Sequence, residues 1–215
     1  MLSYLYAEDL ARDPRLETSM FRDRATQFRD RLRWNVHVDE EGRERDEYDA
    51  MNPLYVIWKT PDGLHGGSMR VLPTTAPCMV NDHFAHVAGG PVTSPLIWES
   101  TRFCLSPRIT HEAARISAAL MLAGCEIGLN FGLRHAVGVF DARMVRIYRS
   151  LGWPPDILGS SGSGAQTVSV GLWDFSTETR YRLAHKARVS PRLSQLWFDR
   201  SFGPVMGQVA LAEAG

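Results

Sequence analysis

The sequence predicts a three-layer α/β/α sandwich with a mixed central sheet, formed by a single domain that spans residues 1–215. Two observations lead to this prediction. Segments of alternating apolar and polar residues, the pattern of strands, are interspersed with segments whose apolar residues recur every three or four positions, the pattern of helices. Apolar residues make up 44% and charged residues 22% of the chain, as in an ordinary globular domain. Helices and strands that follow one another in this way form layers around one sheet.

The first half of the chain is expected to contain a helix, a charged loop and a hairpin. The helix covers 17–33, the loop 35–53, and the hairpin strands 54–60 and 67–72. Apolar residues recur at helical spacing from Met20 to Leu32. Between the two strands, Pro61 presets its own φ and Gly63 supplies a positive φ, which is the chemistry of a turn.

The second half is expected to alternate strands and helices. Strands are predicted at 96–105, 136–140 and 166–173, helices at 110–130, 142–151 and 175–187, and a flexible surface loop at 159–164. Thr110 and Asp141 are the expected N-caps of the first two helices. Gly152, followed by Trp153 and two prolines, ends the second helix. The tail beyond Val189, with Leu196, Trp197 and Phe198, is expected to pack back on the body.

Composition excludes several classes of protein. Lys and Arg total 24, as do Asp and Glu, so the formal net charge is zero and neither nucleic acid nor anionic lipid is an expected partner. The N-terminus lacks the pattern of a secretory signal, and no apolar run approaches the ~20 residues that cross a bilayer. Cys78, Cys104 and Cys125 have no metal-ligand spacing. Free buried thiols indicate a reducing compartment, so we expect a cytoplasmic protein that binds no metal.

Carboxylates, arginines and large aromatic residues are concentrated in four short stretches of the first half. These read FRDRATQFRDRLRW (21–34), RERDEYD (43–49), GGSMRVLPT (66–74) and WESTRF (98–103). An isolated buried ion costs several kcal/mol, so folding must pair these acids and bases. A mixed set of this kind is typical of a pocket for a small ligand that is charged and partly flat.

These stretches, in this order and at these spacings, resemble the acyl-homoserine-lactone synthases of the LuxI type, the bacterial autoinducer synthases. The resemblance implies the fold of the GNAT N-acyltransferases. It also implies acylation of S-adenosylmethionine by an acyl thioester, lactonisation, and release of methylthioadenosine. S-adenosylmethionine is then a substrate, no cofactor is expected, and the acyl donor is carried by acyl carrier protein or coenzyme A. Residues 1–105 would bind S-adenosylmethionine and residues 106–215 the acyl chain and its carrier; the oligomeric state stays open.

The strand that ends the first half supplies the candidate catalytic residues Glu99, Thr101 and Arg102. Alternation places Glu99, Thr101 and Phe103 on one face and Arg102 on the other, so a twist or bulge is needed to bring both sets to one cavity. From the residues alone, Glu99 is either a general base or the partner of Arg70 or Arg102 in a structural ion pair. The resemblance favours the base, with backbone N–H groups near Phe103 stabilising the oxyanion.

The resemblance also implies the residues that bind S-adenosylmethionine. They are Arg24, Phe28, Trp34, Asp46, Asp49, Arg70 and Phe103. Asp46 and Asp49 would meet cationic groups of the ligand, and the arginines would hold these carboxylates. The rings of Phe28 and Trp34 would close the pocket. Without the resemblance, the acidic segment is a solvated face and Phe28 is part of a core stripe.

The acyl chain would lie between the strands 96–105 and 136–140. The candidate walls are Met79, Leu122, Val137 and Val139. Gly138 lies about where some relatives carry a Thr that favours 3-oxo chains, so its absence indicates that no 3-oxo contact is required. Arg143, Arg146 and Arg149 recur every three residues on one helix, where they either receive the acidic acyl carrier protein or form a solvated face.

Two other functions remain open from the sequence. An acetyl-CoA-dependent acetyltransferase of the same fold holds the CoA pyrophosphate with a glycine-containing turn after the central strand. Here that junction reads LSPRITHEAARIS, without glycine, which argues against acetyl-CoA. A catalytically silent binder would bind S-adenosylmethionine without consuming it, and the presence of Glu99 with the whole charged set favours the enzyme.

Overall fold

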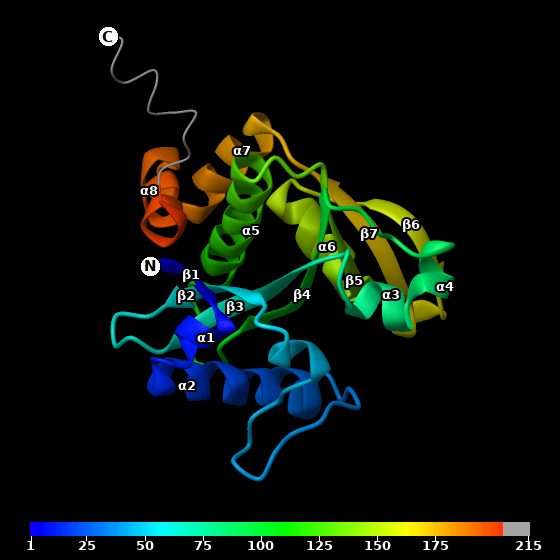
Figure 1. The fold of residues 1–215 in the computed structure, drawn as a ribbon, viewed down its shortest axis with the longest axis horizontal. Helices are drawn as coiled ribbons and strands as arrows, with labels where there is room; N and C mark the ends of the chain where they lie inside the picture. The colour runs from blue at the N-terminus through cyan, green and yellow to red at the C-terminus, as the bar shows by residue number, and fades with distance from the viewer. Residues whose placement is uncertain (204–215) are drawn as a thin grey trace.

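The computed structural model describes residues 1–203, apart from the side chain of Ala165, and its centre is a seven-stranded sheet (Figure 1). The strands lie in the order β1-β2-β3-β4-β5-β7-β6, and of these only β4 and β5 pair in parallel. Their bounds are β1 Leu2–Tyr6, β2 Leu54–Lys59, β3 His65–Pro73, β4 Ile97–Leu105, β5 His135–Asp141, β6 Asp156–Ser161 and β7 Val168–Asp174. The predicted mixed sheet is confirmed.

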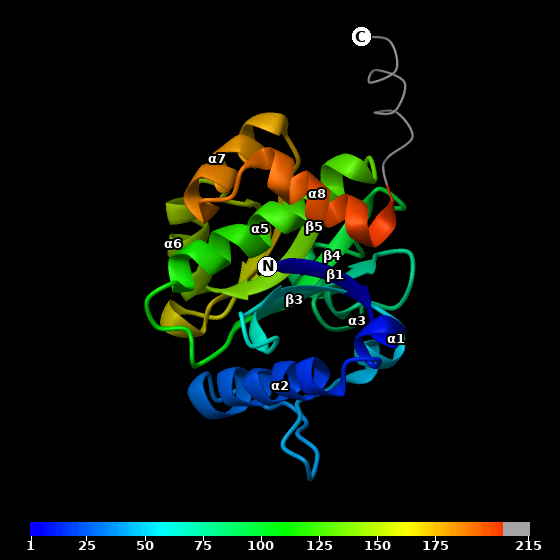
Figure 2. The same ribbon diagram turned by 90° about the vertical axis from the view of Figure 1, so that its left-hand side faces the viewer.

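Helices cover both faces of this sheet, as Figures 1 and 2 show from two directions. The α5 face carries α5 (Ala113–Asn130), α6 (Ala142–Leu151), α7 (Thr177–Ala187) and α8 (Pro191–Phe202). The α2 face carries α2 (Pro14–Ala25), the π-helix η1 (Thr26–Arg31), and the short helices α3 (Met79–His83) and α4 (Ala85–Ala88). A further short helix, α1 (Ala7–Leu10), follows β1. The predicted three-layer sandwich is confirmed.

Strand β2 shows how side chains are divided between the two layers. Val56 belongs to the apolar cluster under α5, whereas Tyr55 and Ile57 pack with residues of α2. All three are buried, because β2 lies inside the sheet and is covered on both faces. A continuous run of large apolar residues is the expected pattern for such a strand.

A β-bulge in β4 changes which face its side chains occupy. Ser68 pairs with Cys104 and Arg70 with Thr101, so Met69 alone lies opposite both Arg102 and Phe103. Arg102 has a positive φ of 54°, as expected for the extra residue of a bulge. The bulge brings Arg102 to the α2 face with Glu99 and Thr101, and turns Phe103 to the α5 face.

The strands β4 and β5 pair only over their first residues. The last pair is Glu99 with Val137, after which β4 continues beside β3 and β5 continues beside β7. The centre of the sheet is therefore unpaired beyond Glu99, at the level of the bulge.

Most of the predicted elements are present. The helix predicted at 17–33 is α2 continued by η1, and the predicted hairpin is β2 with β3. Asp141 caps α6 by accepting a hydrogen bond from the Arg143 N–H at 2.9 Å, and Gly152 ends it with a φ of 78°. The tail forms α8, in which Trp197 and Phe198 are buried while Leu196 is 45% exposed.

Several expectations about local structure were wrong. Residues 159–161, expected in a flexible loop, belong to the edge strand β6, where pairing with β7 prevails over a sequence of low strand propensity. Thr110 does not cap α5, which begins at Ala113 after Glu112. The elements β1, α1, α3 and α4 were not predicted from the sequence. The charged loop at 35–53 includes a 3₁₀ helix, η2 (Glu47–Ala50).

In residues 1–203, no helix has the length and apolar character that a membrane span requires.

Candidate active site

Three arginines and three carboxylates form a closed ring of ion pairs on the α2 face. The members, in order around the ring, are Arg24, Glu44, Arg102, Asp46, Arg70 and Asp49. They come from α2, β3, β4 and the loop that contains η2. Each acid contacts two arginines and each arginine contacts two acids, so the formal charges of this ionic ring cancel.

The contacts in the ionic ring are short and mostly in fork geometry. Arg24 binds both oxygens of Asp49 at 2.9 Å and Glu44 Oε2 at 2.6 Å. Arg102 Nη2 lies 3.0 Å from Glu44 Oε1 and 2.7 Å from Asp46 Oδ2. Arg70 binds both oxygens of Asp46 and contacts Asp49 Oδ1 at 2.8 Å. Arginine suits this arrangement because its planar fork matches a carboxylate.

The ionic ring is open to solvent on one side only. The side chains of Arg24, Arg70 and Glu44 are at most 1% exposed, whereas those of Asp46 and Arg102 are each 11% exposed. Asp49, although burial disfavours its charge, is held ionised by Arg24 and Arg70, so its pKa is lowered. Asp46 and Arg102 are therefore the members that a ligand can reach.

Glu99 lies on the same face as the ionic ring but outside it. Its carboxylate is fully buried and accepts hydrogen bonds from the backbone N–H groups of Met79 at 3.1 Å and Val80 at 2.5 Å. Burial raises the pKa of Glu99 to about 7, although these two N–H groups oppose the shift. A carboxylate with such a pKa can accept and release a proton near neutral pH.

The ion-pair alternative for Glu99 does not occur in the described part of the chain. Arg70 and Arg102 both bind acids of the ionic ring, and Thr101 supports Arg70 by accepting a hydrogen bond from its Nε at 3.1 Å. The structural role that remains for Glu99 is to cap α3, because it accepts hydrogen bonds from the first two N–H groups of that helix.

Phe28 and Trp34 form a stack beside the ionic ring. Their rings are 5.2 Å apart and inclined by 7°. Phe28 is buried and its centroid lies 5.5 Å from the guanidinium carbon of Arg102, while Trp34 is 40% exposed. Phe103, in contrast, packs in the core of the α5 face because of the bulge. The structure therefore brings together all of the predicted S-adenosylmethionine ligands except Phe103.

The candidate acyl-chain residues are divided between the two faces of the sheet. Val137 and Val139 pack with α3 and α4 on the α2 face, where Met79 also lies beside Arg102. Leu122 lies on α5, under the other face. Gly138 also faces that side, where a Cβ would meet the Trp173 ring at 3.2 Å. The sheet separates these groups, so one chain cannot contact all of them.

The arginines of α6 lie on the surface. Arg143, Arg146 and Arg149 are exposed, and Arg143 forms an ion pair with Asp141 at 2.6 Å. They are thus available to an acidic partner, as a solvated helix face would also be.

Sequence reasoning missed Glu44 and the donors of α3. Glu44 is fully buried and joins Arg24 to Arg102. A count of charges could have found it, since the three arginines Arg24, Arg70 and Arg102 need a third acid besides Asp46 and Asp49. The N–H groups of α3 have no side-chain signature.

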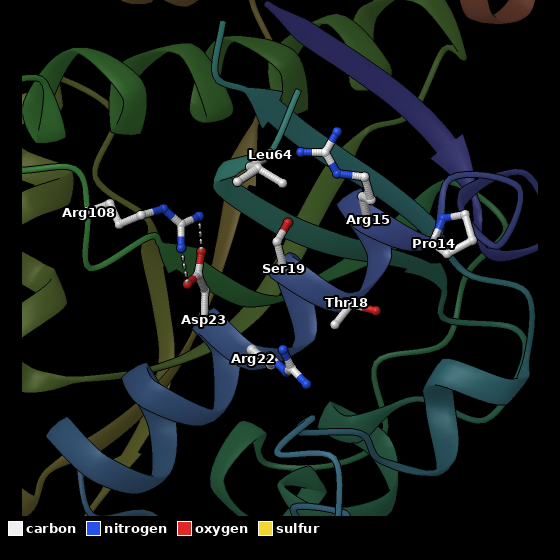
Figure 3. Close-up of a pocket in the computed structure, with 8 residues that line it drawn as sticks. All are labelled: Pro14, Arg15, Thr18, Ser19, Arg22, Asp23, Leu64 and Arg108. Atoms are coloured by element: carbon white, nitrogen blue, oxygen red, sulfur yellow. Dashed lines mark hydrogen bonds and ion pairs between the residues drawn. The ribbon is translucent and has the colours of Figure 1, made fainter. Parts of the chain in front are cut away.

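A separate open cavity of about 430 Å³ lies along α2, from Pro14 to Asp23, and contains none of the predicted site residues (Figure 3). Asp23, at its edge, contacts Arg108 at 3.2 Å and the buried His65 Nδ1 at 2.7 Å. His65 Nε2 lies 2.9 Å from Ser68 Oγ. Asp23, His65 and Ser68 are hydrogen-bonded in the sequence of a hydrolytic triad. His65 and Ser68 are at most 2% exposed, however, so the group is part of the core. Among residues 1–203, no group of His, Cys, Asp and Glu side chains is arranged to hold a metal ion.

Comparisons with known proteins identify the family. The sequence model of the autoinducer synthases matches residues 9–183. An acyl-homoserine-lactone synthase of Rhizobium etli is 40% identical over 200 residues, which cover 91% of this chain and 93% of that protein. The chain belongs to the autoinducer synthase family and is an acyltransferase of the acyl-homoserine-lactone synthase class.

Solved structures confirm the fold. The CoA-dependent acyl-homoserine lactone synthase BjaI, described with SAM and isopentyl-CoA and also with MTA, matches with a TM-score of 0.78. It is 22% identical, and the match covers 88% of this chain and 90% of BjaI. A protein from Lactobacillus plantarum described as an N-acetyltransferase matches with a TM-score of 0.55 at 14% identity, over 82% of this chain and 98% of that one. The GNAT-like fold is thereby confirmed.

Proposed function

We propose that Glu99 and the ionic ring carry out N-acylation of S-adenosylmethionine, followed by lactonisation to an acyl-homoserine lactone. The observation that carries this assignment is the environment of Glu99. Its carboxylate is buried, forms no ion pair with an arginine among the described residues, and has a pKa raised to about 7. A base for an amine must be ionised at the working pH and yet basic enough to take a proton, and this pKa meets both conditions.

In the proposed first step, Glu99 takes a proton from the amino group of S-adenosylmethionine, directly or through a water. The amine nitrogen bonds to the thioester carbonyl carbon and the carbon–sulfur bond breaks. The proton held by Glu99 passes to the departing sulfur, so the carrier leaves as a thiol and Glu99 is ionised again. In the second step, a carboxylate oxygen of the acylated S-adenosylmethionine bonds to the γ-carbon of the same molecule. The bond between that carbon and the sulfonium sulfur breaks, which releases methylthioadenosine. This closure needs little acid–base help because the nucleophile is already attached to the reacting centre.

Asp46 and Arg102 are the proposed contacts for the charged groups of S-adenosylmethionine. They form the exposed side of the ionic ring, where a carboxylate suits the cationic end and a guanidinium suits the carboxylate end. The buried members Arg24, Glu44 and Asp49 would hold this pair in place. The exposed side of Trp34, which stacks on Phe28, is the proposed platform for the adenine ring.

The acyl donor is proposed to enter where β4 and β5 separate, beyond Glu99. Val137 and Val139 would contact the acyl chain from the α2 face, together with Met79. SAM and isopentyl-CoA are the molecules described for BjaI, in agreement with these two substrates. If the donor is an acyl carrier protein, the α6 arginines are the proposed docking surface. Both steps use only the substrates and this chain, so we propose no cofactor.

We also propose that one domain contains both binding regions and works in the cytoplasm. The single sheet that contains β1 to β7 supports the first point. The three buried free cysteines support the second, because reducing compartments keep thiols in this form.

Mass spectrometry of the purified protein tests the proposed function. The protein is incubated with S-adenosylmethionine and a panel of acyl carrier protein and coenzyme A thioesters. Equal amounts of methylthioadenosine and an acyl-homoserine lactone are expected with at least one donor. Binding of S-adenosylmethionine without turnover, or acylation of other amines without its consumption, would contradict the proposal.

A further inference from the structure

The short helix α3 holds the Glu99 carboxylate, so the contacts that fix α3 also fix the proposed base. α3 has five residues, and a helix of this length is not stable by itself. Its position therefore depends on side chains that tie it to neighbouring segments. Asn81 and Asp82 provide two such ties, to two different parts of the chain.

Asn81 ties α3 to the segment that leads into β4. Its side-chain NH₂ donates a hydrogen bond to the Val92 carbonyl at 3.2 Å, and its oxygen accepts one from the Val92 N–H at 2.8 Å. The paired contacts fix the orientation of the amide as well as its distance.

Asp82 ties α3 to the ionic ring through Tyr48. The Tyr48 hydroxyl donates a hydrogen bond to Asp82 Oδ2 at 2.9 Å. Tyr48 belongs to η2, its backbone N–H donates to Asp46 Oδ1 at 3.0 Å, and its buried ring lies 5.4 Å from the guanidinium carbon of Arg70. The side chain of Tyr48 thus connects the loop that carries the three acids of the ionic ring with the helix that holds Glu99.

We propose that Tyr48 and Asp82 are positioning residues for the acylation step, which set the distance and orientation of Glu99 relative to the bound S-adenosylmethionine. This inference rests on the function proposed above. When the Tyr48–Asp82 hydrogen bond is removed, α3 loses its link through Tyr48 to the ionic ring, and its N–H groups are no longer held against the Glu99 carboxylate. Glu99 then loses hydrogen bonds that lower its pKa, so the base becomes protonated at a higher pH.

The test uses Tyr48→Phe and Asp82→Ala, singly and together, in the full chain. Tyr48→Phe keeps the ring against Arg70 and removes only the hydroxyl. Each single variant is expected to lower kcat about fivefold, the effect of one lost hydrogen bond. The pH of half-maximal kcat should rise, and KM for S-adenosylmethionine should change less than kcat. The double variant should lose about as much as either single variant, because both remove the same hydrogen bond.

Two further variants separate positioning from general damage. Asp82→Asn keeps an oxygen that can accept from Tyr48, and should restore most of kcat. Glu47→Gln weakens the exposed contact between Glu47 and His83, 3.3 Å apart, which joins the same two segments. It should leave kcat and the pH profile unchanged. The charged groups that act on Glu99 from neighbouring elements, Arg70 and Asp46, are intact in all of these variants.

Wild-type kcat and an unshifted pH profile in Tyr48→Phe and Asp82→Ala would overturn the inference, as would independent, additive losses. If Tyr48→Phe does not fold, the Asp82→Ala variant is sufficient for the test, because Asp82 is exposed. Failure of the proposed function would appear differently, as a wild-type protein that releases no methylthioadenosine with any donor.

Discussion

Replacing Glu99 by Gln is expected to stabilise the protein at neutral pH while it removes most of the activity. Burial raises the pKa of Glu99 to about 7 from an ordinary value of 4.5. Each pKa unit corresponds to about 1.4 kcal/mol, so keeping this carboxylate ionised in the folded protein costs roughly 3 kcal/mol above pH 7. The glutamine variant does not bear this cost.

The sign of the pH dependence follows from the raised pKa. Between pH 4.5 and about pH 7, the folded state keeps a proton on Glu99 that the unfolded chain has lost. The stability of the wild type therefore falls as pH rises through this window, and the loss stays constant above it. In the variant, the new side-chain NH₂ faces one of the two N–H donors of α3, which offsets part of the gain. A net gain of about 1–2 kcal/mol at pH 8 is expected.

Activity should change in the opposite direction. Loss of a general base lowers kcat by about 10²- to 10⁴-fold. For the wild type, a base with a pKa of about 7 gives half-maximal kcat near that pH. kcat at pH 6 should then be about tenfold lower than at pH 8. The residual kcat of Glu99→Gln should not show this increase between pH 6 and pH 8.

Urea unfolding and methylthioadenosine release, both measured from pH 5 to pH 9, provide the assay. Glu126→Gln is the matched control, because Glu126 is equally buried but forms an ion pair with Arg180 at 2.8 Å on the α5 face. This control should lose stability and keep the pH profile of kcat. A Glu99→Gln variant that lost stability at pH 8 and kept its activity would refute the reasoning and leave Glu99 as a cap of α3.

Three further predictions concern the ionic ring and the buried histidine. Asp46→Asn should raise KM for S-adenosylmethionine about tenfold or more with a smaller change in kcat, measured at a saturating thioester concentration; an unchanged KM would exclude Asp46 as a ligand. Glu44→Gln should lower the free energy of unfolding by about 3–5 kcal/mol in urea, because it leaves the buried Arg24 and the neighbouring Arg102 each short of a partner; an unchanged midpoint would contradict the ionic ring. Burial lowers the pKa of His65, so the unfolded chain takes up a proton below pH 6.5 that the folded chain refuses. The stability deficit of His65→Gln should therefore shrink between pH 7.5 and pH 5.5, and urea midpoints that differ equally at both values would contradict this.

The parts of the fold that follow from local periodicity could be predicted from the sequence. Helical spacing in α2 and capping by Asp141 in α6 depend on residues close together in the chain, and both predictions are confirmed. The strand β6 could not be found in this way. Its residues include Gly159, Ser160 and Ser161, which have low strand propensity, and its conformation depends on pairing with β7 along the sheet edge.

The pairing of charges in the candidate site could be predicted from the sequence, but the face of the sheet on which each β4 side chain lies could not. Unpaired buried ions are costly, so the pairing of Arg24 and Arg70 with acids could be expected, and it is present. Strict alternation placed Phe103 with Glu99 and separated Arg102 from it. A single inserted residue reverses both assignments, because every side chain after a bulge changes face. No local signal in WESTRF marks the position of that residue.

The two kinds of carboxylate on the α2 face differ because their hydrogen-bond donors differ. Asp49 receives guanidinium groups, which lower its pKa although burial alone would raise it. Glu99 is similarly buried but receives only neutral N–H groups of α3, which oppose the effect of burial without overcoming it. The ionic ring contributes to this difference, because each of its arginines is already bound by two acids and none forms an ion pair with Glu99. Removing an acid from the ionic ring should therefore affect more than ligand binding: an arginine released toward Glu99 would lower the pKa of Glu99 and weaken it as a base.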